Sequence, residues 1–166
     1  MRKHAKRRQP RRLVNPLALA VQQATKLTAA EVSQQMGPCR LAFDALRQGR
    51  ATLRQWQIMA ATLTIAASIE KQGVVKGLAG LLAEVDEVLD AIEGRAVQGL
   101  TAGGWRAPVL RGEEIRRLQE FLRVHQFQLE QLSYREYRQA CAQAVARVRC
   151  GGGVAIDLRK EECEMA

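Results

Sequence analysis

The chain has 166 residues, the size of one domain, and this is long enough to bury a core without disulfide bonds. Ala, Leu, Arg, Glu and Lys together supply half of the residues, which is a composition typical of helices. No apolar run approaches the ~20 residues that a membrane-spanning helix requires. The longest candidate, residues 58–69, is interrupted by three hydroxyl side chains. Composition therefore predicts a helical protein and excludes one that spans a membrane.

The charge is unevenly distributed along the chain. Lys and Arg number 26 against 17 Asp and Glu, so the formal net charge is +9. Residues 1–30 hold eight of these basic residues and no acid, because Glu31 is the first carboxylate. The other 136 residues therefore carry a net charge of only +1. We expect a nearly neutral helical body with a strongly basic N-terminal arm.

Residues 1–16 are predicted to form a flexible arm that is disordered without a partner, because like charges are dense there and no apolar period can be buried. A basic start followed by residues 13–21 superficially resembles a secretory signal. The apolar stretch is interrupted by Asn15 and Pro16, however, and it lacks a convincing small-residue cleavage site. We therefore expect a cytoplasmic protein.

The first predicted helix begins after a short helical segment at residues 17–23. Thr28 and Glu31 form the pattern of a capping box, in which each side chain bonds the other residue's backbone amide. Gly37 and Pro38 should break or kink this helix, because proline lacks a backbone donor and disfavours helix at the preceding residue. Gly49 should end it.

Two further helices follow. Thr52 and Gln55 form a second capping box, and apolar residues then recur at steps of three and four until Gly73. This helix is rich in alanine, so a neighbouring helix can approach it closely. The clearest period lies in residues 78–96, which combine one apolar stripe with an acidic opposite side.

The second half of the chain contains a loop and two further predicted helices. Glycines and Pro108 mark a loop over residues 99–108, and residues 105–110 are expected to be extended. The next apolar stripe runs from Ile115 to Leu132 and includes His125. A third capping box starts at Ser133, and its helix should end before the three glycines at 151–153.

These elements predict an all-α protein. Four or five helices with short connections favour a helical bundle, because each apolar stripe must find another helix. The predicted organisation is a basic arm over residues 1–16, one helical domain over 17–150 and a loose C-terminal tail over 151–166.

The arm is the first candidate binding site, and arginine predominates in it. The arginine fork pairs bidentately with phosphate and stays charged at any relevant pH. If all seven basic residues of the arm displaced counterions from duplex DNA, log affinity would fall against log salt with a slope of roughly −6. A solvated tail, or one that meets an acidic protein surface, is the alternative. The predicted nucleic-acid-binding residues are Arg2, Lys3, Lys6, Arg7, Arg8, Arg11 and Arg12.

An acidic stretch is the second candidate. It comprises Glu84, Asp86, Glu87, Asp90 and Glu93. Asp86, Asp90 and Glu93 share a helix face, where carboxylates can hold a hard cation such as Mg²⁺. A solvated face opposite the apolar stripe is the preferred interpretation, since no histidine or second carboxylate motif accompanies the set. A third interpretation is that this face receives a basic arm, either its own or a partner's.

Two single residues each have a structural and a functional interpretation. His125 has no serine or cysteine nucleophile tied to it by a motif, so we expect a hydrogen-bonded core histidine rather than a general base. Trp105 lies in the glycine-rich loop, where it is either an exposed anchor for a partner or a lid folded back on the core.

The four cysteines show no metal-binding spacing. Cys39, Cys141, Cys150 and Cys163 contain no Cys-x-x-Cys pair. We expect reduced thiols, with a disulfide between Cys163 and either Cys141 or Cys150 as the minor alternative.

Several short motifs resemble a family of small bacteriophage and prophage accessory proteins of proteobacteria. The resemblance covers roughly residues 1–150 and lies in the order of the motifs at 1–3, 13–16, 45–52, 112–114, 125–129 and 134–140. It implies a protein that acts inside a bacterial cell and has no catalytic residues to carry over. The tasks that it implies are DNA-associated work, regulation, or neutralising a host defence such as a CRISPR system.

Together these patterns predict a non-enzymatic protein, without a metal or cofactor, that binds DNA or RNA through its arm. Arg7, Arg8, Arg11 and Arg12 are the expected phosphate contacts. The alternative is an inhibitor that occupies the surface of a host protein complex. Homodimerisation through an alanine-rich helix stays open. In the alternative, the partner-binding residues are Glu84, Glu87, Asp90, Glu93 and Trp105.

Overall fold

The computed structural model describes residues 16–98 and 105–151. Six helices lie in these ranges, and the only β-type pairing within them is one isolated bridge. In chain order the helices are α1 (Pro16–Ala24), α2 (Ala29–Arg47), α3 (Leu53–Gln72), α4 (Ala79–Gln98), α5 (Gly112–Gln131) and α6 (Tyr134–Cys150).

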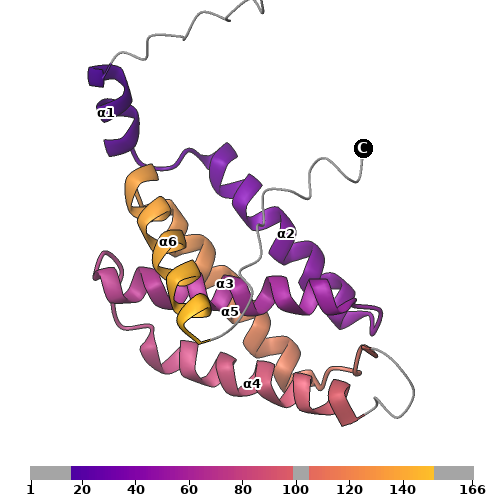
Figure 1. Ribbon diagram of the computed structural model, residues 1–166. Helices are drawn as coiled ribbons and strands as arrows, with labels where there is room; N and C mark the ends of the chain where they lie inside the picture. The colour runs from indigo at the N-terminus through magenta and orange to yellow at the C-terminus, as the bar shows by residue number, and fades with distance from the viewer. Residues whose placement is uncertain (1–15, 99–104, 152–166) are drawn as a thin grey trace, which may run out of the picture.

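Helix α3 is the centre of the bundle, because it packs against α2, α4, α5 and α6. Helix α5 lies beside α3 and also contacts α2 and α4 (Figure 1). The short helix α1 extends away from the bundle at one end and packs against α6 (Figure 1). The predicted all-α bundle is confirmed.

All three predicted capping boxes are present. Thr28 N donates to Glu31 Oε2 at 2.8 Å, and Glu31 N donates to Thr28 Oγ1 at 3.3 Å. The bonds from the Thr28 backbone and side chain lower the pKa of Glu31. The same reciprocal bonds start α3 at Thr52 and α6 at Ser133. The helix starts are therefore encoded locally.

Glycine ends the second and third helices, as predicted. Gly49 has a φ of 66°, and the amides of Gly49 and Arg50 donate to the carbonyls of Leu46 and Ala45. This is the Schellman arrangement, which satisfies the last carbonyls of a helix. Gly73 has a φ of 78° at the end of α3.

Of the break or kink expected at Gly37 and Pro38, the break is wrong, because α2 is helical without interruption from Ala29 to Arg47. Proline disfavours helix at the preceding residue by a clash with that residue's Cβ. The preceding residue here is Gly37, which has no Cβ. Packing of α2 against α3 and α5 then holds the helix together despite the missing backbone donor.

The predicted apolar stripes form the core. Leu82, Val85, Leu89 and Ile92 of α4 are buried, as are Leu118, Leu122 and Leu129 of α5. Residues that the stripes did not include, such as Phe121, are also buried. Residues 105–110, which we expected to be extended, form neither a helix nor a strand.

A short backbone bridge joins the two halves of the chain. Leu27 N donates to Leu132 O at 2.9 Å, and Tyr134 N donates to Thr25 O at 3.2 Å. The turn before α2 is thereby attached to the turn before α6. This attachment places the end of α1 at the start of α6, and the start of the described chain lies at the far end of α1 (Figure 1).

None of the described helices is long and apolar enough to cross a membrane. Residues 1–15 of the predicted arm and residues 152–166 of the predicted tail lie outside the described residues, and so do the predictions made for them. Pro16, which we expected to be the last residue of the arm, is instead the first residue of α1.

Candidate functional site

The candidate site lies where the arm joins the bundle. The seven predicted nucleic-acid-binding residues, Arg2 to Arg12, lie outside the described residues, but their attachment point is described. The chain enters the structure at Pro16, the first residue of α1, and α1 packs against α6. The side chain of Lys26, which follows α1, donates to Gln131 Oε1 at 3.2 Å. The arm is therefore attached next to α6.

Helix α6 carries four exposed arginines, which the sequence analysis did not single out. Arg135, Arg138 and Arg149 lie within about 60° of one another around the helix, at 100° per residue. Arg147 lies on another side. We call Arg135, Arg138 and Arg149 the α6 basic face. The only acid of α6, Glu136, bonds Ser133 in the capping box, so its carboxylate is held at the start of the helix.

The acidic residues of α4 divide into two groups. Glu84 forms an ion pair with Arg117 of α5, with Arg117 Nη1 and Glu84 Oε2 3.2 Å apart. Asp86, Glu87 and Asp90 are exposed, and Glu93 is half-buried. No group of three or more His, Cys, Asp or Glu side chains is placed to hold a metal ion within the described ranges. Asp86, Asp90 and Glu93 therefore do not form the ligand set that was weighed for Mg²⁺.

The near-neutral body predicted from the sequence proves to contain regions of opposite charge. The described ranges hold 17 Lys or Arg and 13 Asp or Glu, and five of those acids but only one of those bases lie on α4. Helix α4 thus carries −4, and the remaining described residues carry +8. The part of the body to which the arm is attached belongs to this basic remainder.

Trp105 folds back on the bundle, which is one of its two predicted positions. Its indole Nε1 donates to Ala51 O at 2.7 Å, and its ring centroid lies 5.7 Å from that of Trp56. The side chain is half-buried. Trp105 therefore closes the loop before α5 over the turn between α2 and α3, and it is not presented as a free anchor.

His125 is a core histidine, as expected. It is buried, it stacks on Phe121, and its Nδ1 lies 3.2 Å from Gln128 Oε1. Gln128 Nε2 in turn donates to Ala66 O of α3 at 3.2 Å. Burial lowers the pKa of His125 to about 4, although the bond to Gln128 opposes this shift. A neutral, enclosed ring of this kind ties α5 to α3.

Glu114 is a second buried polar residue, and only the structure shows its role. Its Oε2 accepts from Arg111 N at 2.7 Å and from Arg95 Nη2 at 2.8 Å. The carboxylate thus caps α5 and joins it to the end of α4. Acids are ordinary in the first turn of a helix, so the sequence does not signal the contact of Glu114 with Arg95.

Cys39 is the most deeply enclosed of the described cysteines. Burial raises the pKa of its thiol to about 11, so the sulfur stays protonated near neutral pH. A protonated, enclosed thiol is a weak nucleophile and a poor metal ligand. Cys39 therefore serves packing.

Comparison with protein-family models, with curated proteins and with solved structures gave no match for this chain. The resemblance to phage accessory proteins stays a prediction.

Proposed function

We propose that this is a phage-encoded, non-enzymatic accessory protein that binds nucleic acid through its N-terminal arm, with the α6 basic face as a second row of phosphate contacts. One observation carries the proposal: the arm is attached to α1, and α1 packs against the helix that bears Arg135, Arg138 and Arg149.

Phosphate chemistry supports this arrangement. Arginine pairs bidentately with phosphate, and each phosphate neutralised releases counterions. A helix provides a rigid row of charges, whereas an arm can follow a backbone of variable shape. The acidic side of α4 repels phosphate, so the nucleic acid is directed to the arm and α6.

The test measures binding of a labelled 25-base-pair duplex, and of single-stranded DNA and RNA of that length, between 50 and 300 mM salt. For the full chain on duplex DNA we expect a log–log salt slope of roughly −6 or steeper. Deleting residues 1–12 should abolish binding at physiological salt.

A pair of substitutions tests the contribution of α6. Arg135→Ala with Arg138→Ala should make the salt slope shallower by roughly two, because two phosphate contacts are lost. Arg116→Ala with Arg123→Ala, on α5, removes the same charge outside the α6 basic face and should change the slope much less. Binding that survives deletion of the arm would overturn the proposal.

The second candidate is a protein-binding inhibitor of a host system. Exposure of Asp86, Glu87 and Asp90 on one helix favours it, because such a row of carboxylates can imitate phosphates. A pull-down from nuclease-treated host lysate distinguishes the two functions. A stoichiometric protein partner that Asp86→Asn with Asp90→Asn abolishes would support inhibition.

A further inference from the structure

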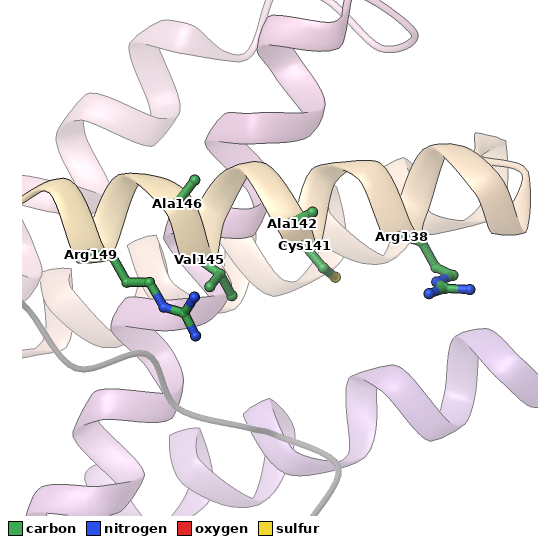
Figure 2. A pocket seen from close by; sticks show the side chains of 6 residues that line it. All are labelled: Arg138, Cys141, Ala142, Val145, Ala146 and Arg149. Atoms are coloured by element: carbon green, nitrogen blue, oxygen red, sulfur yellow. The ribbon is translucent and has the colours of Figure 1, made fainter.

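Helix α6 has a second lengthwise strip that the bundle leaves uncovered. Its first strip, with Tyr137, Ala140 and Ala144, is buried in the bundle. Beside it runs a surface hollow of about 430 Å³, in which small apolar side chains lie between two arginines (Figure 2). The hollow is lined by Arg138, Cys141, Ala142, Val145, Ala146 and Arg149.

The side chains that line the hollow determine the chemistry of the segment that fits into it. A shallow strip of Ala and Val accepts a narrow apolar segment, and an arginine at each end requires carboxylates on that segment. Arg138 and Arg149 point to the same side of the helix as Cys141 and Val145 (Figure 2). The occupant is therefore a peptide that is both apolar and acidic.

A second copy of α6 does not meet this requirement. Antiparallel pairing would place Arg138 of one copy opposite Arg149 of the other, and parallel pairing would place each arginine beside its counterpart. Both arrangements bring like charges together, which opposes association.

The C-terminal segment of the chain does meet it. This segment starts where α6 ends, and the three glycines at 151–153 allow the chain to reverse direction. Val154, Ile156 and Leu158 then alternate with other residues. The acids of the segment are Asp157, Glu161, Glu162 and Glu164, against the two bases Arg159 and Lys160.

The length of the segment is sufficient. The eleven residue steps from Arg138 to Arg149 span about 16 Å along the helix. Residues 154–166 can extend to about 43 Å, so fewer than half of them cover the hollow. We propose that residues 154–164 fold back along α6 and occupy this hollow, with the apolar side chains on Ala142, Val145 and Ala146 and the carboxylates at Arg138 and Arg149.

Cys141 provides the test, because its thiol lines the hollow. The rate of Cys141 alkylation by iodoacetamide is measured by peptide mass spectrometry in the full chain, with Cys163→Ser present to prevent a disulfide. Ile156→Ser with Leu158→Ser, and separately Glu161→Gln with Glu162→Gln and Glu164→Gln, should each raise that rate. We expect about a fivefold rise or more, as for a segment that is docked most of the time.

Matched variants on α6 complete the experiment. Glu161→Lys with Glu162→Lys should raise the Cys141 rate, and adding Arg138→Glu with Arg149→Glu should lower it again by restoring opposite charges. Arg135→Glu with Arg147→Glu, on the same helix but outside the hollow, should not. Slow alkylation of the buried Cys39 in every variant shows that the bundle stays folded.

Equal Cys141 rates in the wild type and in both tail variants would overturn the proposal. A Cys141 rate that falls with protein concentration would overturn it in favour of a second copy as the occupant. Neither readout involves nucleic acid, so the test is independent of the proposed function, although the docked segment and phosphate would compete for Arg138 and Arg149.

Discussion

At the scale of single residues, the buried His125 makes stability depend on pH. Its pKa in the folded protein is about 4, below the ordinary 6.5, so protons bind the unfolded chain more tightly. Stability is therefore complete above pH 6.5 and declines as the pH falls toward 4. The loss should approach roughly 3 kcal/mol, from 1.36 kcal/mol per pKa unit.

The measurement is urea unfolding at several pH values between 7.5 and 4. His125→Gln removes the titrating ring and should flatten this part of the profile. His4→Gln, which changes the second of the two histidines, should leave it unaltered. Parallel profiles for wild type and His125→Gln would contradict the assignment.

Trp105 provides a second prediction at this scale. Trp105→Phe keeps a ring beside Trp56 but deprives Ala51 O of its donor, which should cost about 1 kcal/mol. Trp105→Ala also removes the ring packing and should cost about 2 kcal/mol. Unfolding followed by circular dichroism measures both.

Val109→Ala is the control for Trp105, because Val109 lies in the same loop and is 83% exposed. It should change the free energy of unfolding by less than about 0.5 kcal/mol. A neutral Trp105→Ala would contradict the conclusion that Trp105 stabilises the fold by closing the loop before α5.

At the scale of the helix, alanine variants of two glycines measure the effect of backbone conformation on stability without a change in packing. A Cβ added at Gly94 or at Gly49 would meet no atom within 4 Å outside the adjacent residues, so neither substitution creates a clash. Gly94 lies inside α4, whereas Gly49 has a φ of +66° just beyond the end of α2. Any difference between the two alanine variants therefore comes from the backbone.

Gly94→Ala should raise the free energy of unfolding by about 0.5–1 kcal/mol, since alanine is the better helix former. Gly49→Ala should lower it by about 1 kcal/mol, because a side chain disfavours the left-handed conformation. Denaturant midpoints at equal slope measure both changes. Two effects of the same sign would contradict this interpretation.

The helices themselves were largely readable from local chemistry. Thr28, Thr52 and Ser133 mark helix starts because a capping box is satisfied by residues three positions apart. The break expected at Pro38 is absent because proline's local preference against a helix interior has limited strength. The neighbouring glycine and the tertiary contacts of α2 overcome that preference.

At the scale of the whole molecule, the separation of charge makes a prediction about α4. Asp86→Asn, Glu87→Gln and Asp90→Asn together should change the affinity for duplex DNA by less than about threefold at 150 mM salt, since the screening length there is about 8 Å. Anisotropy titration of the triple variant measures this. A gain in affinity of tenfold or more would place the acidic side of α4 inside the interface, because the lost carboxylates would then have repelled phosphate.

The sequence by itself determined the helices, their caps, the apolar stripes and the concentration of basic residues in the arm. These depend on side chains only a few positions apart. The tertiary structure alone decided that Trp105 folds back, that Glu114 joins α4 to α5, and that α1 packs against α6, the helix that carries the α6 basic face. Each of these contacts joins residues that are far apart in the chain. The net charge of +1 on the 136 residues after the basic N-terminal segment does not show which surfaces hold the opposite charges.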